Sequence, residues 1–384
     1  MKVALIIERI ETWRGGAETS TVQFAAHLAR QGCRVRVLTA SVAPSTPDME
    51  VVTIPASPVL RGVRTWLFAR RAVEWARREG FDILHGVTAC PGLDVYQPRG
   101  GTAPETLART AAAVQGAMAR RLKRLAAMLS LKQQVVLRLE RRLLAGGDRP
   151  LVIAISDYVR RQLQRHYGLG DSHVRLVFNG VDPDTSPPAQ RRADRTRVRR
   201  QLGLADDDII ALCVAHNFRL KGVWSLVEAL ARVPRDDVYA VIVGRDDPRP
   251  FAHRAEELGV GRRVLFAGPT QGTPAFYHAA DMLVHPTFYD PCSRVVLEAM
   301  AAGLPVITTR FNGAAERVTD GREGFVIDCP RQIDALADRI TRLLDDGLRR
   351  ACAELAPRAT GDISMAEHAR RVLAVYREVC ARRG

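Results

Sequence analysis

Short apolar runs that alternate with helical segments constrain the fold of this chain more than any other feature. Each run is continuously apolar, which is typical of parallel strands buried on both faces. Strands are predicted at residues 3–7, 34–39, 51–54, 83–85, 151–155 and 174–178, and in a second series at 209–214, 238–243, 263–266, 282–285, 305–308 and 324–327. Helices fit between them, for example at 17–30, 61–78, 156–167, 222–231 and 293–302. This alternation predicts a doubly wound α/β architecture, and two series predict two Rossmann-like domains.

The boundary between the two series lies at residues 179–188, where turn formers and prolines continue neither a strand nor a helix. The length of 384 residues agrees with two domains, because a domain typically holds about 100–200 residues. In such a pair we expect substrate to bind in a cleft between the domains, at the carboxyl ends of the strands.

The chain is strongly basic, with 57 Lys and Arg against 42 Asp and Glu and a net charge of +15. This excess predicts an anionic partner, which could be nucleic acid, an acidic membrane or a phosphorylated small molecule. Seven scattered cysteines without a C-x-x-C pair favour neither a disulfide framework nor a zinc site, and indicate a reducing compartment. The first apolar run is too short for a signal peptide and no stretch is long enough to span a membrane, so a cytoplasmic protein is expected.

A pair of glycines, Gly15 and Gly16, follows the first predicted strand and precedes a helix. Glycines at such a turn let the backbone approach a ligand beside a helix N-terminus, which favours anions. A tight turn without a ligand is the simpler alternative. The chain lacks G-x-G-x-x-G, which argues against a dinucleotide cofactor.

In the second half, Lys221 and Gly222 follow the strand at 209–214 and begin a helix. A lysine at the carboxyl end of a strand can reach a phosphate as a point charge. The alternative is a solvated lysine at an ordinary helix start.

Two acids eight residues apart, Asp290 and Glu298, follow the strand at 282–285. A helix that starts near Ser293 would offer open amides around residues 292–294 to a diphosphate. Glu298 lies on an otherwise apolar helix, where a carboxylate needs hydrogen-bond donors, and a ribose diol supplies two. A buried acid satisfied by backbone amides is the alternative.

These motifs resemble those of a known family, the retaining glycosyltransferases of family 4, which have the GT-B fold. The resemblance covers nearly the whole chain: Gly-Gly-Ala-Glu at 15–18, Asn-Gly-Val-Asp at 179–182, Lys-Gly at 221–222, and the acid-x7-Glu segment that continues to residue 306. Residues 91–96 and 285–291 look most like the branch of lipopolysaccharide-core glucosyltransferases. The implied domains are an acceptor-side domain over 1–178, to which a helix at 365–384 returns, and a nucleotide-sugar donor domain over 179–364.

The resemblance also implies roles for individual residues. Lys221 would contact the donor diphosphate and stabilise the leaving group, Glu298 would bind the nucleotide ribose, and Asp290, where the family usually has Glu, would contact sugar hydroxyls. Gly15 and Gly16 would line the cleft near the phosphates and the acceptor. The family needs no metal or other cofactor and retains anomeric configuration, so positioning and charge stabilisation would carry catalysis. The implied catalytic residues are Lys221 and Asp290, and the implied donor-binding residues are Gly15, Gly16, Arg219, Lys221, Asp290, Cys292, Ser293, Arg294 and Glu298.

The chain departs from the family pattern at several positions. In the family an arginine often lies five residues before the lysine or immediately before it. These positions hold His216 and Leu220 in this chain, which makes Arg219 the candidate substitute. Gly100 lies in a segment where the branch often has an active-site acid, and Val87 lies where the family often has a histidine. His85 is interpreted as a structural residue at a strand end. Donor residues are therefore better supported than any acceptor residue or catalytic base.

Most of the excess charge lies in two segments. Residues 105–149 have a net charge of +7, with apolar residues at helical spacing, and residues 191–200 have a net charge of +5. A basic amphipathic helix can lie on anionic lipid, and the family branch is membrane-associated in this region. We expect the apolar stripe of 105–149 to be partly buried and its cations to face lipid. For 191–200 we expect a solvated helix face near the cleft.

The main hypothesis is therefore a transfer of a hexose, with UDP-glucose as the leading donor, to a glycan or glycolipid acceptor at the inner face of the cell membrane. A nucleotide-sugar epimerase or phosphorylase of the same fold is one alternative. A basic nucleic-acid-binding protein is another, but aromatic residues make up only 6% and are absent from the helical part of 105–149. Nucleic acid is not an expected partner.

Overall fold

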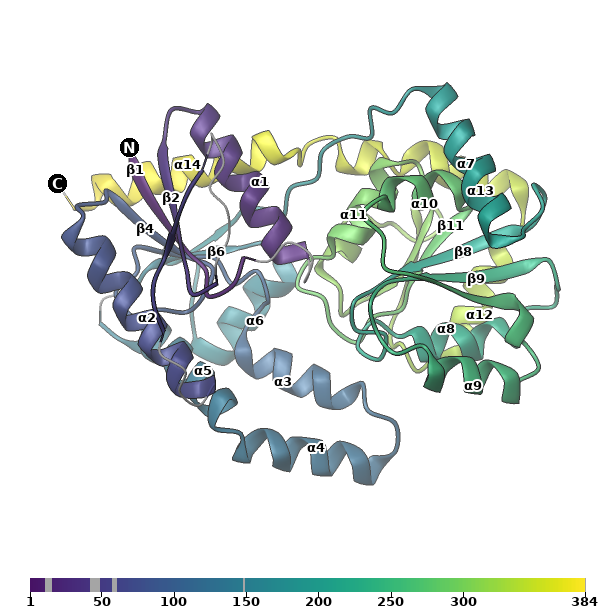
Figure 1. The fold of residues 1–384 in the computed structure, drawn as a ribbon, viewed down its shortest axis with the longest axis horizontal. Coiled ribbons are helices and arrows are strands. Elements are labelled where there is room, and N and C mark those ends of the chain that lie inside the picture. Colours follow the sequence, from purple (N-terminus) through teal and green to yellow (C-terminus); the bar gives the residue numbers. More distant parts are fainter. Residues whose placement is uncertain (11–15, 42–48, 57–60, 148, 384) are drawn as a thin grey trace. The chain divides into compact units, whose positions relative to one another are not determined.

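A computed structural model describes residues 1–10, 16–41, 49–56, 61–147 and 149–383. It divides into two compact units, which are Met1–Gly180 with Met365–Gly384, and Val181–Ser364. Each is an α/β unit built on a parallel sheet, which confirms the predicted fold class (Figure 1).

The first unit contains, over its described residues, a seven-stranded parallel sheet with the order β3-β2-β1-β4-β5-β6-β7. Residues such as Val3, Leu5 and Val37 are fully buried because helices cover both faces. The two-residue strand β5 was missed by the sequence analysis, because two residues carry no periodicity. The strands are β1 Lys2–Ile6, β2 Arg34–Thr39, β3 Glu50–Thr53, β4 Ile83–Gly86, β5 Val95–Tyr96, β6 Leu151–Ala154 and β7 Val174–Leu176.

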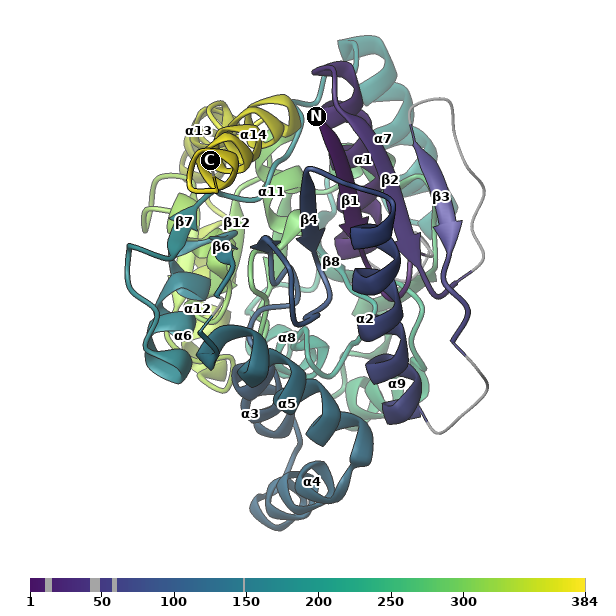
Figure 2. The same ribbon diagram turned by 90° about the vertical axis from the view of Figure 1, so that its left-hand side faces the viewer.

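The helices of this unit include one from the far end of the chain. They are α1 Gly16–Arg30, α2 Arg61–Arg78, α3 Ala103–Ala112, α4 Ala117–Leu129, α5 Leu131–Ala145, α6 Asp157–Tyr167 and α14 Met365–Ala381. Helix α14 packs against α1 and β6 (Figures 1 and 2). Gly180 permits this packing, because a Cβ atom there would lie 2.9 Å from the Met365 Cα.

Buried polar contacts hold α14 in place. The ring of His85, at the end of β4, has its Nδ1 atom 2.5 Å from the Tyr376 hydroxyl. The Nδ1–H of His368 donates to the Phe178 carbonyl at 2.7 Å. Burial, and secondarily the Arg99 cation, lower the pKa of His368 to about 3, so this imidazole is neutral. His85 is thus a core residue, in agreement with its structural interpretation.

The second unit contains, among the residues described, a six-stranded parallel sheet with the order β10-β9-β8-β11-β12-β13. The strands are β8 Ile209–Val214, β9 Val238–Val243, β10 Val264–Gly268, β11 Met282–His285, β12 Val306–Thr309 and β13 Gly324–Ile327. The helices are α7 Pro188–Leu202, α8 Val223–Leu230, α9 Arg249–Glu257, α10 Thr273–Ala279, α11 Arg294–Ala301, α12 Ile333–Arg342 and α13 Asp346–Leu355, with a 3-10 turn η3 Gly313–Arg317 that follows β12.

The arginine-rich helix α7 has the solvated face that the sequence predicted, with Arg192 and Arg200 exposed, but not all of its arginines lie on that face. Arg199 is 1% exposed and donates to Asp281 at 2.7 Å and to the Ala279 carbonyl at 3.1 Å. Arg195 also donates to Asp281, at 3.0 Å. This buried pairing was not predicted, because the acid lies more than 80 residues away along the chain.

The basic segment of the first unit also differs from expectation. Every residue of α4 is at least partly exposed, whereas Leu139 and Leu143 of α5 are buried. The expected partial burial of the stripe therefore holds for α5 and is wrong for α4. Within the described part of the chain, every helix is too short or too polar to cross a membrane.

Candidate functional site

The loop between β8 and α8 places Lys221 at the carboxyl edge of the second sheet. Asp246, which follows β9, accepts from the Phe218 amide at 2.8 Å and so anchors this loop. Gly222 has φ +78°, and a Cβ atom there would lie 2.0 Å from the Pro286 carbonyl oxygen. Only glycine fits at this position, and it brings the lysine next to the loop after β11.

The loop after β11 carries Asp290 and is tied down on two sides. The Phe288 amide donates to the Leu220 carbonyl at 2.8 Å, which joins this loop to the lysine loop. The Asp290 amide donates to the Phe311 carbonyl at 2.8 Å, on the segment after β12. Three strand ends thus meet around one carboxylate.

Lys221 and Asp290 form an ion pair, with Nζ 2.6 Å from Oδ2. Nζ also donates to the Tyr289 carbonyl at 3.3 Å. Burial alone would raise the pKa of the Asp290 carboxyl, but the Lys221 charge and His285 hold it well below the ordinary value. The two predicted catalytic residues, 69 positions apart, are therefore brought together as a charged pair.

His285, at the end of β11, is a member of this cluster that the sequence analysis did not identify. Its side chain is 1% exposed, and its Nε2 atom lies 3.7 Å from Asp290 Oδ2, beyond hydrogen-bond distance. Neither ring nitrogen has a hydrogen-bond partner among the described residues. Burial lowers the pKa of this imidazole, so it stands neutral beside the ion pair.

Glu298 lies on α11 with its carboxylate partly exposed and already bound by two protein donors. The Tyr277 hydroxyl donates to Oε2 at 3.0 Å, and Arg294 Nη2 donates to Oε1 at 2.9 Å. The expectation that only a ligand or backbone amides would satisfy this acid is therefore wrong. Tyr277, on α10, gave no signal in the sequence, because it reaches Glu298 only through the packing of two helices.

The N-terminus of α11 is also more occupied than expected. The Ser293 amide donates to the Asn312 side-chain oxygen at 3.0 Å, so it is not open to a diphosphate. Asn312 is 1% exposed and also accepts from the Ala314 amide at 3.0 Å. Cys292 is buried at the same turn. A buried carboxamide thus joins the starts of α11 and η3.

Further positive charge surrounds the Lys221 loop. Arg219 is exposed, and its side chain makes no hydrogen bond or ion pair with another residue in the described ranges. Partial desolvation, together with the Arg245 and Lys221 charges, lowers the pKa of His216. Arg245, which follows β9, is thus a neighbouring cation that the sequence analysis missed.

The predicted residues of the first unit contribute less. Gly15 lies outside the described residues, and Gly16 is the first residue of α1. In the segment that departs from the family pattern, Arg99 is buried beneath Gly100 and donates to Ser20 Oγ at 2.5 Å and to Gln97 Oε1 at 3.1 Å. This arginine links the end of β5 to α1.

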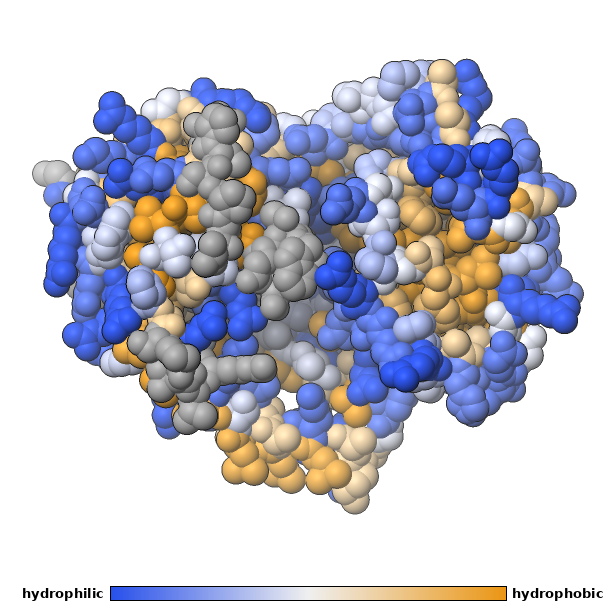
Figure 3. Space-filling view, viewed as in Figure 1, coloured by the Kyte–Doolittle hydropathy of each residue, from blue (hydrophilic) through white to orange (hydrophobic). Residues whose placement is uncertain are grey.

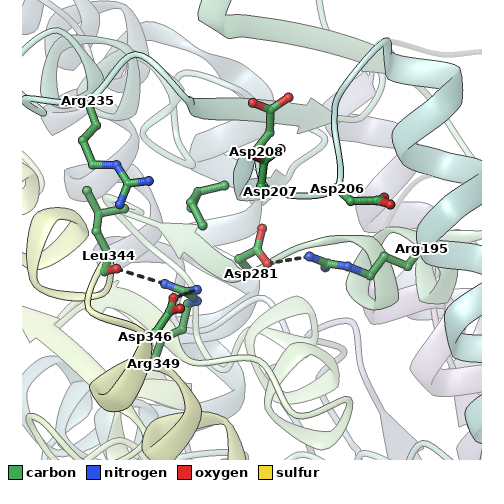
Figure 4. Close-up of a pocket in the computed structure, with 10 residues that line it drawn as sticks. Arg195, Asp206, Asp207, Asp208, Arg235, Asp281, Leu344, Asp346 and Arg349 are labelled. Atoms are coloured by element: carbon green, nitrogen blue, oxygen red, sulfur yellow. Dashed lines mark hydrogen bonds and ion pairs between the residues drawn. The ribbon is translucent and has the colours of Figure 1, made fainter.

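A separate pocket of about 430 Å³ lies at the opposite, amino-terminal edge of the second sheet (Figure 4). It is lined by Ile209, the first residue of β8, and by Asp281, which precedes β11. Asp281 is held by Arg195, and Arg349 donates to the Leu344 carbonyl. The pocket contains none of the predicted site residues, so it is not the candidate site.

Comparison with known proteins identifies glycosyltransferase sequence in both units. The sequence profile "Glycosyltransferase Family 4" matches residues 14–185, and "Glycosyl transferases group 1" matches residues 194–359. Lipopolysaccharide glucosyltransferase WaaG of Escherichia coli is 28% identical over 347 residues, which cover 89% of this chain and 90% of that protein.

Solved structures agree with the sequence comparison. A crystal structure of WaaG, described as a glycosyltransferase involved in lipopolysaccharide biosynthesis, matches with a TM-score of 0.82 and 26% identity, covering 97% of this chain and 99% of that one. Anabaena HepE in complex with UDP-glucose matches with a TM-score of 0.74 and 21% identity, covering 98% of this chain and all of that one.

Proposed function

We propose that this chain, which belongs to the glycosyltransferases of family 4 and group 1, is a retaining hexosyltransferase that uses a nucleotide-sugar donor, with UDP-glucose as the leading candidate. The acceptor is a glycan or glycolipid at the inner face of the cell membrane. The observation that carries the proposal is the Lys221–Asp290 ion pair at the carboxyl edge of the second sheet. The loop that holds Asp290 continues from this edge into α11, the helix that carries Glu298.

Donor binding exchanges the partners of this pair. Lys221 leaves Asp290 for the donor diphosphate, where a point charge stabilises the leaving group. Asp290, freed from the lysine, turns its carboxylate to the sugar hydroxyls, and the neutral His285 close by can donate one hydrogen bond to it. Glu298, with two donors already in place, uses its remaining lone pairs to accept from the ribose hydroxyls.

The transfer itself is a balanced substitution at the anomeric carbon. The bond from that carbon to the diphosphate oxygen breaks, and a bond to the acceptor oxygen forms on the same face of the sugar. The acceptor proton passes to the leaving diphosphate, which departs with the electron pair of the broken bond. The residues of the chain contribute position and charge, and Lys221 offsets part of the negative charge of the diphosphate without a metal ion.

Helix α4 is the membrane-facing element in this proposal. Met118, Leu122, Leu125 and Leu129 form one helical face and are 56–86% exposed. The surface at the bottom of Figure 3, where Figure 1 places α4, is largely hydrophobic. Four cations, at positions 120, 121, 123 and 124, lie on the same helix without an acid. Such a helix lies in the interface with its apolar face in lipid and its cations on anionic headgroups, each contributing about 1 kcal/mol.

Transfer and hydrolysis assays with UDP-glucose, UDP-galactose, UDP-GlcNAc, GDP-sugars and ADP-sugars test the enzymatic proposal. We expect release of UDP with retained configuration in the product, and an unchanged rate in the presence of EDTA. An inverted product or a rate that vanishes with EDTA would contradict the proposed mechanism. Release of a sugar phosphate, or of an epimerised nucleotide sugar, would instead identify the phosphorylase or epimerase alternative.

Liposome flotation with and without anionic lipid tests the membrane proposal separately. Replacement of Arg120, Arg121, Lys123 and Arg124 by Gln should release the protein from anionic liposomes. A matched variant that loses the same charge from exposed positions of the second unit, Arg192, Arg200, Arg262 and Arg358, should remain bound. Equal behaviour of the two variants would mean that α4 is not the membrane-binding element.

A further inference from the structure

A pocket of about 630 Å³ lies in the first unit between α2 and α5, and none of the residues that line it is assigned to sugar transfer (Figure 2 shows the two helices side by side). One side is apolar: Val73 and Leu139, which are 7% and 6% exposed, line it together with Val135 and Pro91. This apolar surface is an integral part of the unit, because both helices contribute to it.

The rim of the same pocket is cationic. It carries Arg70, Arg138 and Arg142 against a single acid, Glu74. Arg70 is paired with that acid at 2.6 Å and lies 5.9 Å from the centre of the Trp66 ring, so its charge is already compensated. The charges of Arg138 and Arg142 are not compensated by any residue that the structure describes.

Arg138 and Arg142 are exposed and stand one helical turn apart on α5, so they lie on the same face of the helix. Across the described ranges, neither side chain makes a hydrogen bond or ion pair with another residue. Two like charges at this spacing repel each other, and a shared anion removes the repulsion. Trp66, 41% exposed at the rim, adds an aromatic ring with one apolar and one polar end.

We propose that this pocket binds a single anionic phospholipid-type molecule, with its phosphate on Arg138 and Arg142 and the first part of its hydrocarbon on the apolar side. Charge complementarity selects the phosphate, and the Val73–Leu139 surface selects hydrocarbon next to it, which a free phosphate or a sugar phosphate does not provide. The site is discrete and saturable, unlike the surface that α4 presents to a bilayer. It goes beyond sugar transfer and does not depend on the donor assignment.

Helix continuity supports this occupant. Helix α5 begins at Leu131, separated from the last residue of α4 only by Ser130, and Leu131 is itself exposed. The pocket therefore stands on the helix that directly continues the exposed amphipathic one. A lipid molecule held there would tie the unit to a membrane through a specific contact, in addition to the nonspecific one of α4.

Calorimetric titration of the full chain with dihexanoyl phosphatidylglycerol, below its micelle concentration, tests the proposal without any bilayer. We expect saturable binding of one lipid per chain. The double variant Arg138→Gln/Arg142→Gln should bind at least about tenfold more weakly, a loss of about 1.4 kcal/mol. The control Arg192→Gln/Arg200→Gln, which removes the same charge from exposed positions of the second unit, should change the affinity less than about twofold.

A second variant and two ligands complete the design. Val135→Phe fills the apolar side without a charge change, and it should weaken lipid binding while the midpoint of thermal unfolding and the binding of donor stay unchanged. Absence of binding to the unmodified chain, equal losses in the two double variants, or unaltered binding by Val135→Phe would overturn the proposal. If inorganic phosphate bound as tightly as the lipid, the site would be a phosphate site without selection for hydrocarbon. If dihexanoyl phosphatidylcholine bound as tightly as the phosphatidylglycerol, the proposed selection for negative charge would be contradicted.

Discussion

Two histidines occupy the same place in the two sheets and have different surroundings. His85 is the penultimate residue of β4, which pairs with the first strand of the first sheet, and His285 is the last residue of β11, which pairs with the first strand of the second. Both are buried, but the His85 ring has the Tyr376 hydroxyl of α14 at 2.5 Å, whereas the His285 ring has no hydrogen-bond partner in the described part of the chain and lies 3.7 Å from Asp290. The same position in a repeated fold therefore has two different surroundings. In the first unit a helix covers the strand ends, and His85 is a core contact. In the second unit two loops meet there, and His285 lies beside an ion pair.

Removal of the ion pair beside His285 should have the largest effect. We expect Lys221→Gln and Asp290→Asn each to reduce kcat about 10²–10³-fold, as is typical when one charge-stabilising group is lost from a transition state. Initial rates at saturating donor measure this. Lys132→Gln, a change of an exposed lysine on α5, is the control and should retain full activity. Full activity in Lys221→Gln would contradict the assignment of the leaving-group residue.

Replacement of the partnered histidine should affect stability instead of chemistry. We expect His85→Ala to lower the free energy of unfolding by about 3 kcal/mol, because it leaves a cavity and an unpaired Tyr376 hydroxyl in the core. Urea denaturation measures this loss, and the activity per folded molecule should stay near that of the unmodified chain. His253→Ala, at an exposed position, is the control and should change stability by less than about 0.5 kcal/mol.

The third effect is a pH dependence that belongs to the first unit. His368 has a folded-state pKa of about 3 against an ordinary value of 6.5, so between these values the unfolded chain binds a proton that the folded chain does not. Stability is therefore fully present above pH 6.5 and falls as the pH drops toward 3, by up to about 1.4 kcal/mol per unit. In His368→Asn, which retains a donor for the Phe178 carbonyl, urea denaturation across this range should show a shallower slope. An identical slope would show that this histidine is not the titrating group.

Replacement of the unpartnered histidine should cost the least stability. We expect His285→Leu to change the free energy of unfolding by less than about 1 kcal/mol, because an apolar side chain removes two unsatisfied ring nitrogens. The rate should still fall about tenfold or more, since Asp290 loses the donor that replaces Lys221 during the reaction. His285→Asn, which retains an N–H donor, should recover part of the rate. A large loss of stability in His285→Leu without a change in rate would make this histidine equivalent to His85.

The architecture and the placement of Lys221 and Asp290 after strands of the second series could be predicted from the sequence because both depend on local pattern, whereas their ion pair was not predicted. Continuous apolar runs located the strands, and the positions of Lys221 and Asp290, each just after a strand, implied the same edge of one sheet. Tyr277 as a donor to Glu298, Asn312 as the acceptor for the Ser293 amide, and Asp281 as the partner of Arg199 could not be predicted. Each depends on which loop or helix packs beside it, and no periodicity carries that information.

The two basic helices also show that the sequence pattern alone does not determine which apolar residues are buried. Helices α4 and α5 share an apolar stripe among cations, yet Leu139 is buried and Leu125 is exposed. The buried Glu140 explains part of this difference, because it accepts from the Tyr96 and Tyr167 hydroxyls at 2.9 and 2.5 Å and so fastens α5 to the unit. Helix α4 has no acid in its sequence that could make such a contact.

Calorimetric titrations with UDP-glucose and with uridine separate the two donor-binding roles on which the proposed function depends. Lys221→Gln should weaken UDP-glucose about tenfold or more and leave uridine unchanged, because the lysine acts on the diphosphate. Glu298→Gln should weaken both ligands, because the carboxylate acts on the ribose, and each loss should be at least about 1.5 kcal/mol. Unchanged binding of UDP-glucose by both variants would contradict the assignment of the donor site to the carboxyl edge of the second sheet.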